Sequence, residues 1–263
     1  MTNNAGMDGN VAIVTGGAMG MGEATARLFA ERGAKVILAD ISDEAGKRVV
    51  EEIRAAGGEA TYVHCDVSNE DEVAAMVTAA VETYGRLDCA VNNAATMPDM
   101  APIHEADASV FDRIITINLK SVLLCMKHEL GQMLKQEDRG GFRMRGSIVN
   151  IASISGIRPQ PGNPAYMAAK SGVIGLSRSA SFDYAPRGIR VNTVAPGAIK
   201  TPMVWKSFEE FGGSEEEYAP YISLFNRMGE PSEVAEASLW LCSDAASYVT
   251  GQVLAVDAGY TTR

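Results

Sequence analysis

Short apolar runs alternate with amphipathic helical patterns along the chain, and this alternation limits the possible folds more than any other feature. The runs cover residues 11–15, 35–40, 61–66, 87–92, 147–152, 189–194 and 253–257. Strands that alternate with helices favour a parallel sheet covered by helices, and such strands are apolar throughout because neither of their faces meets water. We therefore expect an α/β fold with a mostly parallel, seven-stranded sheet and helices on both faces.

No linker divides the 263 residues, so we expect a single domain over residues 1–263, with residues 1–9 as a flexible lead-in. Two less regular segments interrupt the pattern, one at residues 136–146 and one at residues 202–227. No apolar run reaches the ~20 residues that a membrane helix needs. The N-terminus also lacks a secretory pattern, and these two observations together predict a cytoplasmic protein.

The charge and the metal-binding residue types exclude several classes of partner. The net charge of −10 disfavours nucleic acids and anionic membrane surfaces, because both attract basic patches. The three histidines show no ligand spacing, and four cysteines stand far apart, at positions 65, 89, 125 and 242. We expect free thiols in a reducing compartment and no metal site.

The first apolar run leads directly into a glycine-rich segment, residues 15–22, after which a helical pattern begins. Glycines let the backbone turn tightly and approach a pyrophosphate without a clash at Cβ. The following helix start offers free N–H groups and the positive end of its dipole. Glycine-rich turns also serve as plain connections, but the position between a strand and a helix favours a dinucleotide cradle.

Asp40 ends the second apolar run, where an acidic side chain can accept hydrogen bonds from the adenosine ribose hydroxyls. Its carboxylate would repel a 2′-phosphate at close range, and no arginine follows it in the next residues to attract that phosphate. A helix cap or a solvated loop acid is the plainer interpretation, although Ser42 or Asp43 can serve as the cap. The pattern favours NAD over NADP.

Tyr166 and Lys170 lie four residues apart where a helical pattern begins, so both side chains share one helix face. A nearby ammonium stabilises a phenolate, which would let Tyr166 exchange a proton with a carbinol oxygen while hydride moves at carbon. Ser153 follows the fifth apolar run, at the sheet edge where ligands bind, and would hold the substrate oxygen. Asn118 is an unusual polar residue inside a long helical region.

These motifs together resemble the short-chain dehydrogenase/reductase family in its single-domain form. The resemblance extends from about Asn10 to Tyr260, with family-like order and spacing. Its motifs are Thr15-Gly16 with Gly20 and Gly22, Asp66-Val67, Asn92-Asn93-Ala94, Asn118, Ser153, Tyr166 with Lys170, and Pro196-Gly197 with Thr201. It implies a Rossmann-type, doubly wound fold and an NAD-dependent alcohol dehydrogenase or ketone reductase that assembles as a homotetramer.

The resemblance also implies roles for individual residues. Tyr166 would be the general acid/base, Lys170 would lower its pKa and hold the nicotinamide ribose, and Ser153 would orient the substrate oxygen. Asn118 would hold a water that links Lys170 to solvent. The cofactor would contact Gly16, Met19, Gly20, Met21, Asp40, Asp66, Val67, Asn93, Tyr166, Lys170, Pro196, Ile199 and Thr201.

Four features depart from the family pattern. Met19 and Met21 stand where a small or polar residue and a branched aliphatic residue are usual, and Ala95 replaces a common glycine. The segment at residues 137–145 is longer than the usual turn. None of these departures affects the expected proton chemistry.

In the family, the segment after Pro196-Gly197 is a lid over the substrate. Here residues 202–227 gather aromatic and methionine side chains: Met203, Trp205, Phe208, Phe211, Tyr218, Tyr221 and Phe225. They would suit a bulky apolar or cyclic substrate, and an ordinary helix pair packed on the core would use the same residues. The substrate-binding candidates are Ser153, Tyr166, Met97, Ile157, Met203 and Trp205, with Pro98 and Asn163 as weaker ones.

The sequence leaves two alternatives to a dehydrogenase of cyclic secondary alcohols. A 3-oxoacyl-thioester reductase would share the motifs, but Asp40 argues against NADPH, and the acidic run at residues 215–217 is expected to face solvent and to repel an acidic carrier. A non-catalytic dinucleotide-binding protein would share the fold, but it predicts loss of at least one residue of the catalytic group, and all four are present.

Overall fold

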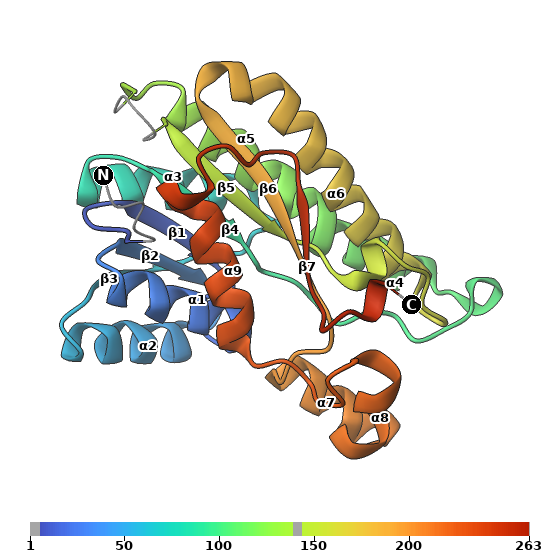
Figure 1. The fold of residues 1–263 in the computed structure, drawn as a ribbon. Coiled ribbons are helices and arrows are strands. Elements are labelled where there is room, and N and C mark those ends of the chain that lie inside the picture. Colours follow the sequence, from blue (N-terminus) through green and yellow to red (C-terminus); the bar gives the residue numbers. More distant parts are fainter. Residues whose placement is uncertain (1–5, 139–143, 263) are drawn as a thin grey trace.

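A seven-stranded sheet forms the centre of the computed structural model, which describes residues 6–138 and 144–262 (Figure 1). The strands lie in the order β3-β2-β1-β4-β5-β6-β7, and every pairing between these strands is parallel. They are β1 (Val11–Thr15), β2 (Lys35–Asp40), β3 (Glu59–His64), β4 (Cys89–Asn92), β5 (Gly146–Ile151), β6 (Ile189–Pro196) and β7 (Val253–Val256). The predicted fold class is confirmed.

Helices cover both faces of the sheet (Figure 1). One face carries α1 (Gly20–Glu31), α2 (Asp43–Ala55) and α9 (Pro231–Cys242), and the other carries α3 (Glu70–Tyr84), α5 (Ser121–Met133) and α6 (Pro164–Tyr184). Alternate residues of β1 enter different cores, with Val11 and Ile13 in one and Ala12 and Val14 in the other. This double burial is why the strand is apolar at every position.

The order of the strands reverses beside β1, where the chain returns from β3 to form β4. In an open parallel sheet, ligands bind outside the carboxyl ends of the strands at such a reversal. Thr15 ends β1 and Asn92 ends β4, so the loops after these two strands meet at this place. The topology therefore fixes the edge at which a site is expected.

The helical region after β4 is not one regular helix. α4 (Ala108–Ile115) leads into a π-helical turn over Thr116–Lys120, and α5 follows directly. Wide turns of this kind occur mostly inside α-helices and often at functional sites. Asn118 lies at the middle of the turn. The short 3₁₀ helices cover Ile103–Glu105, Ile154–Gly156, Ala185–Arg187, Asp244–Ala246 and Tyr260–Thr262.

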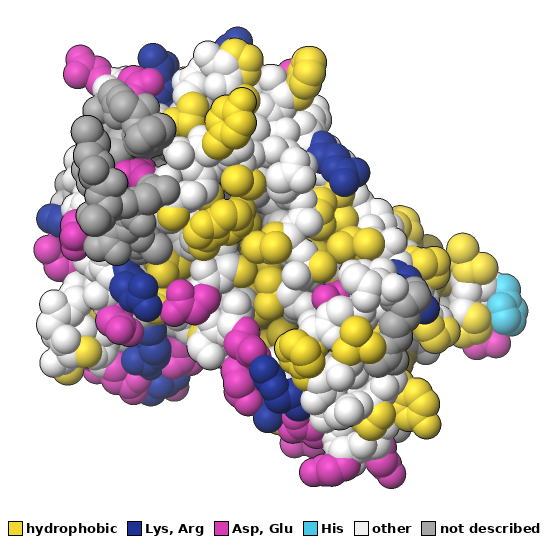
Figure 2. Space-filling view, viewed as in Figure 1, with side chains coloured by type: hydrophobic (Ala, Val, Ile, Leu, Met, Phe, Trp, Pro, Cys, Tyr) yellow, Lys and Arg dark blue, Asp and Glu magenta, His cyan; other side chains and the backbone are white. Residues whose placement is uncertain are grey.

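Residues 202–227, which the sequence predicts to be a lid, include two helices, α7 (Pro202–Phe211) and α8 (Glu215–Ile222), which project away from the sheet (Figure 1). Their aromatic rings pack on one another, because Phe208 lies 5.8 Å from the ring centroids of both Trp205 and Tyr218, with edge-on geometry. Acidic side chains gather at the outer end of this helix pair (Figure 2). The side chain of Phe211 lies outside the described residues.

Three expectations need correction. The expected flexible lead-in, residues 1–9, is held in place from residue 7 onward, because Met7 is fully buried and its N–H donates to the carbonyl of Arg32 at 2.8 Å. β3 begins at Glu59, since its register with β2 starts at the pair Lys35 and Glu59 rather than at the first apolar residue. β4 begins at Cys89, two residues later than expected. Residues 1–5 of the lead-in and 139–143 of the longer segment lie outside the described residues.

All four cysteines are buried and carry free thiols. Within residues 6–138 and 144–262, no helix has both the length and the apolarity to cross a membrane. In the same part of the chain, no cluster of histidine, cysteine, aspartate or glutamate has the geometry to hold a metal ion.

Candidate active site

The loop between β1 and α1 is held open by glycine conformations. Gly16 and Gly20 have φ angles of 64° and 58°, in the region that favours glycine. α1 begins at Gly20, and its N-cap residue Met19 makes no side-chain hydrogen bond to the first turn. The first N–H groups of a 12-residue helix therefore point at the loop without a cap, which is the arrangement that binds a diphosphate.

Asp40 lies beside this loop. Its carboxylate accepts hydrogen bonds from the backbone N–H groups of Ala18 at 3.0 Å and Ser42 at 2.9 Å, one on each oxygen. Each carboxylate oxygen has a second lone pair, so the side chain retains acceptor capacity for ribose hydroxyls. The structure thus places the acidic residue against the glycine loop, as a ribose-binding role requires.

Asn93 joins the same loop from β4. Its amide donates to the carbonyls of Thr15 at 3.0 Å and Gly16 at 3.1 Å, and the Thr15 hydroxyl accepts its backbone N–H at 3.0 Å. These bonds tie the ends of β1 and β4 together at the reversal of the strand order. The side-chain NH₂ of Asn93 already donates to these two carbonyls. Any contact of Asn93 with a ribose would therefore involve other atoms of the residue.

The segment after β6 meets the loop from the other side. A Cβ atom on Gly20 would lie 3.3 Å from the Thr201 side chain, so the start of α7 adjoins the start of α1. Ile199 is buried and forms an isolated bridge with Gly229, and Pro196 ends β6 in the core. The three residues thus belong to the segment that runs from the end of β6 to the start of α7.

The remaining cofactor candidates differ in exposure. Asp66 is exposed, and its Oδ1 accepts from the N–H and the hydroxyl of Ser68. Val67 is buried in the core on the α3 face. Met19 is 48% exposed, while the Met21 side chain packs against the core on the α1 face. Met21 is thus partly buried whereas Met19 is exposed, a difference that sequence reasoning did not distinguish.

Ser153, Tyr166 and Lys170 come together at the carboxyl edge of β5. Ser153 follows β5 and caps the 3₁₀ turn Ile154–Gly156 by accepting the N–H of Ser155 at 3.1 Å. Tyr166 lies in the first turn of α6 and makes a side-chain hydrogen bond with Ser153. The Lys170 ammonium lies 5.6 Å from the centroid of the Tyr166 ring. The three side chains form one contiguous polar group.

Burial sets the proton affinities in this group. It lowers the pKa of the Lys170 ammonium to about 8. It raises the pKa of the Tyr166 phenol, and the bond with Ser153 opposes that rise. We expected Lys170 to lower the pKa of Tyr166, but in this structure desolvation raises it, and the interaction that opposes the rise is the bond with Ser153. The ammonium donates to the carbonyl of Ile151 at 2.9 Å, which directs it toward the strand end.

Asn118 is fully buried in the π-helical turn and holds the loop after β4. Its Oδ1 accepts the N–H of Thr96 at 2.7 Å, and its amide donates to the Thr96 carbonyl at 3.2 Å. The side chain is therefore used for loop anchoring. A role for Asn118 in holding a water would rest on the amide's second N–H or on the backbone groups that the wide turn leaves free.

The other substrate candidates come from three separate segments of the chain. Met97 lies in the loop after β4 and is half-buried, and Ile157 is 45% exposed just after the 3₁₀ turn. Met203 and Trp205 lie on α7, where Trp205 packs on Phe208. In the acidic run, Glu216 and Glu217 are exposed as expected, whereas Glu215 is partly buried. It pairs with Lys200 at 3.2 Å and accepts the N–H of Met228.

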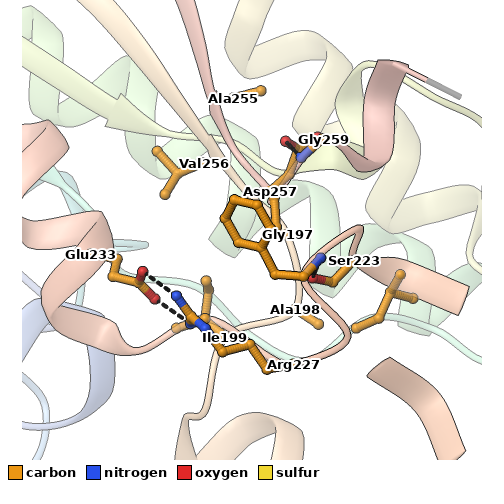
Figure 3. Close-up of a pocket in the computed structure, with 14 residues that line it drawn as sticks. Gly197, Ala198, Ile199, Ser223, Arg227, Glu233, Ala255, Val256, Asp257 and Gly259 are labelled. Atoms are coloured by element: carbon orange, nitrogen blue, oxygen red, sulfur yellow. Dashed lines mark hydrogen bonds and ion pairs between the residues drawn. The ribbon is translucent and has the colours of Figure 1, made fainter. Parts of the chain in front are cut away.

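A separate cavity of about 270 Å³ lies beneath the lid, next to the C-terminal turn (Figure 3). Arg227 and Glu233 form an ion pair on one side of it, and Asp257 and Gly259 lie on the other. It does not include Ser153 or Tyr166. Its charged side chains already have partners, because Arg227 pairs with Glu233 and the Asp257 carboxylate accepts the N–H groups of Gly259 and Thr261. Ser153 and Tyr166 therefore remain the candidates for the proton chemistry.

The structure also reveals contacts that sequence reasoning missed. Asp99 accepts hydrogen bonds from the first turn of α6, and Glu129 lies fully buried against Asn92. Asp99 gave no signal beyond its place in a loop after β4. Glu129 did give one, since a glutamate among the apolar positions of a core helix is unusual.

Comparisons with known proteins agree with this geometry. A family model described as "Enoyl-(Acyl carrier protein) reductase" matches residues 16–261. The short-chain dehydrogenase/reductase astE of Aspergillus oryzae is 44% identical, with 96% of this chain and 95% of that protein covered. The cis-4-hydroxycyclohexanecarboxylate dehydrogenase of Sinomonas cyclohexanicum is 45% identical, with 95% and 96% covered. The crystal structure of levodione reductase superposes with a TM-score of 0.89 at 36% identity, with 97% and 98% covered.

Proposed function

Because this chain belongs to the short-chain dehydrogenase/reductase family, we propose that it is an NAD-dependent dehydrogenase of cyclic secondary alcohols. The observation that carries the proposal is the meeting of Ser153, Tyr166 and Lys170 at the carboxyl edge of β5. That edge continues into the glycine loop, where the uncapped start of α1 and the Asp40 carboxylate suit a dinucleotide. A nicotinamide cofactor bound there would accept the hydride as NAD or supply it as NADH.

We assign the proton chemistry to Tyr166. In alcohol oxidation, its phenolate would take the proton from the carbinol oxygen, and in ketone reduction its phenol would return it. Ser153 would hold the same oxygen through its hydroxyl, since it already lies within hydrogen-bonding reach of Tyr166. The positive charge of Lys170 favours the phenolate, and a pKa of about 8 lets this side chain exchange protons near neutral pH.

Asp40 supports NAD as the cofactor. Its carboxylate lies against the loop that would hold the adenosine end, with free acceptor capacity for two ribose hydroxyls. A 2′-phosphate at the same place would bring like charges together. The amide of Asn93 donates to the carbonyls of Thr15 and Gly16, and these bonds keep the loop close to the end of β4.

The proposed substrate class rests on the relatives and on the lid. The name of the Sinomonas relative gives a hydroxyl on a cyclohexane ring as its substrate. The lid of this chain presents half-exposed Trp205 and Tyr218, and flat rings pack well on a saturated ring. A carrier-bound acyl chain is less suited, because the lid is rich in exposed acidic side chains (Figure 2).

The test is the change in nicotinamide absorbance with NAD or NADP against a panel of secondary alcohols. The panel contains cyclohexanols, cyclohexanediols, hydroxysteroids, linear 2-alkanols and 3-hydroxyacyl thioesters. We expect turnover with NAD and the cyclic alcohols. Turnover with NADP and thioesters alone would establish the reductase alternative. NAD binding without turnover of any alcohol would indicate a dinucleotide-binding protein.

We further propose that the chain acts in the cytoplasm as a homo-oligomer, a tetramer by analogy with the family. On α5, Met126, Leu130 and Met133 are buried in the core, and Leu134, just after this helix, packs against the same core, so these side chains face the sheet. Leu123 and Phe182 instead expose 48% and 86% of their surface on α5 and α6. Light scattering of the wild type and of Phe182→Glu tests this, with a smaller assembly expected for the variant.

A further inference from the structure

Asp99 caps the helix that carries Tyr166, although 66 residues separate it from that helix. Its Oδ2 accepts the backbone N–H of Ala165 at 3.0 Å, and its Oδ1 accepts the backbone N–H of Tyr166 at 3.1 Å. The side chain is buried, with 9% of its surface exposed. One carboxylate thus holds two neighbouring backbone donors, one of them on the proposed acid/base residue itself.

The local sequence explains why a distant cap is needed. Asn163 occupies the N-cap position of α6, but its side chain makes no cap hydrogen bond. Pro164 at the first helical position has no N–H, and the N–H of Met167 bonds to the Asn163 carbonyl. Ala165 and Tyr166 are therefore the two donors that the helix itself leaves unsatisfied. Asp99 accepts both.

The position of Tyr166 makes this cap important. A residue in the first turn is fixed by its cap and its neighbours rather than by the helical ladder, and first turns fray readily. Hydrogen bonds to a carboxylate are stronger than those to a neutral group, and negative charge is favoured at a helix start. The same loop also holds Asn118 through Thr96. The loop after β4 therefore ties two proposed site residues to the cofactor edge.

We propose that Asp99 is a positioning residue for Tyr166, which it holds in register with Ser153 through the first turn of α6. This inference rests on the proposed function, because it assigns the purpose of the cap to the proton chemistry of Tyr166. Asp99 itself exchanges no proton with substrate. Its loss should reduce the rate of the chemical step more than it weakens binding of NAD or alcohol.

The experiment compares Asp99→Ala and Asp99→Asn with the wild type and with Asp107→Ala. Asp107 is a matched control, because it caps α4 by accepting the N–H of Ser109 at 2.7 Å and is exposed. Hydrogen–deuterium exchange of peptides that cover residues 160–170 reports the first turn of α6 without any need for activity. Steady-state kinetics and NAD titration then separate kcat from KM and from the Kd of the cofactor.

We expect at least about fivefold faster exchange of the Ala165 and Tyr166 amides in Asp99→Ala, as for loss of one buried hydrogen bond. We expect kcat to fall ~10- to 100-fold, because small displacements of a reacting group slow the chemical step by about this much. The Kd of NAD should stay within about twofold, since a change confined to kcat marks an interaction of the transition state. Asp99→Asn retains one acceptor oxygen, so its amide exchange rate and its kcat should lie between those of Asp99→Ala and the wild type. Asp107→Ala should match the wild type.

Unchanged amide exchange in both Asp99 variants would overturn the inference, and so would faster exchange with an unchanged kcat. A uniform loss, in which NAD affinity and kcat fall together with thermal stability, would indicate general scaffolding and would also overturn it. If the wild type fails to oxidise any alcohol of the panel, the proposed function fails. The exchange experiment would then still decide whether Asp99 holds the backbone of Tyr166.

Discussion

The side-chain amide of Asn92 donates a hydrogen bond to Oε2 of Glu129 at 3.0 Å, with both side chains buried between β4 and α5. Two other atoms of the pair, Oδ1 of Asn92 and Oε1 of Glu129, are buried acceptors without a partner among the described residues. Protonation of Glu129 would remove its buried negative charge. It would also create an O–H group that can donate to a buried acceptor. Burial accordingly raises the pKa of Glu129 to about 7, although the bond from Asn92 opposes the rise.

This raised pKa predicts a pH-dependent contribution to stability. The pKa of Glu129 is above its ordinary value of 4.5, so between pH 4.5 and about 7 the folded protein keeps a proton that the unfolded chain has lost. The free energy of unfolding therefore falls as pH rises through this window and stops falling above it. A rise of the pKa from 4.5 to about 7 corresponds to roughly 3 kcal/mol.

Urea unfolding at several pH values measures this effect when the wild type is compared with Glu129→Gln. The glutamine keeps the size and an acceptor oxygen but does not titrate. We expect the variant to lack the decline between pH 4.5 and 7, with the exposed Glu51→Gln as the control that retains it. Parallel curves for wild type and Glu129→Gln would show that Glu129 does not change its protonation on folding.

Tyr166→Phe tests the proposed proton transfer. Removing the phenol hydroxyl leaves the ring beside Lys170 but leaves no group to exchange a proton with the carbinol oxygen. We expect kcat to fall by ~10²- to 10⁴-fold while NAD still binds, as for loss of a general acid/base. Tyr184→Phe at the end of the same helix is the control and should keep full activity. Substantial turnover by Tyr166→Phe would remove the residue from its assigned role.

Asp40→Asn tests the proposed cofactor preference. The amide keeps one acceptor oxygen for the loop N–H groups but loses the charge that repels a 2′-phosphate. We expect kcat/KM for NADP relative to NAD to rise about tenfold, a ~1.4 kcal/mol change of selectivity. Asp43→Asn is the control. Asp43 follows three residues later and bonds to Tyr62 and His64, so its substitution should leave the ratio of NADP to NAD use unchanged. An unchanged ratio in Asp40→Asn would place the selection at another residue.

The sheet was predictable because its strands are buried on both faces, so apolar runs such as that of β1 stand out from the helices between them. The proximity of Ser153, Tyr166 and Lys170 was predictable because Tyr166 and Lys170 are close in sequence and Ser153 follows a strand end. Asp99 was not, since its partner lies on another element and only the folded loop brings the two together. The lowered exposure of Glu215 depends likewise on tertiary pairing with Lys200.

The burial of Met7 leads to a final prediction, about the segment before β1. This side chain is fully buried in the core on the α1 face, and the backbone N–H groups of Met7 and Gly9 bond to the carbonyls of Arg32 and Gly33. Met7→Ala would leave a cavity that the strand cannot close, and large-to-small changes of this kind cost ~2–5 kcal/mol.

The free energy of unfolding of Met7→Ala should therefore fall by about 2 kcal/mol or more, while Met100→Ala, at a position 54% exposed, should change it by less than about 0.5 kcal/mol. Chemical denaturation measures both variants. Because Met7 lies next to the turn between α1 and β2 and far along the sheet from Tyr166, kcat of the folded variant should remain that of the wild type. Equal stability of the two variants would mean that the segment before β1 does not contribute to the core in solution, as the sequence alone suggested.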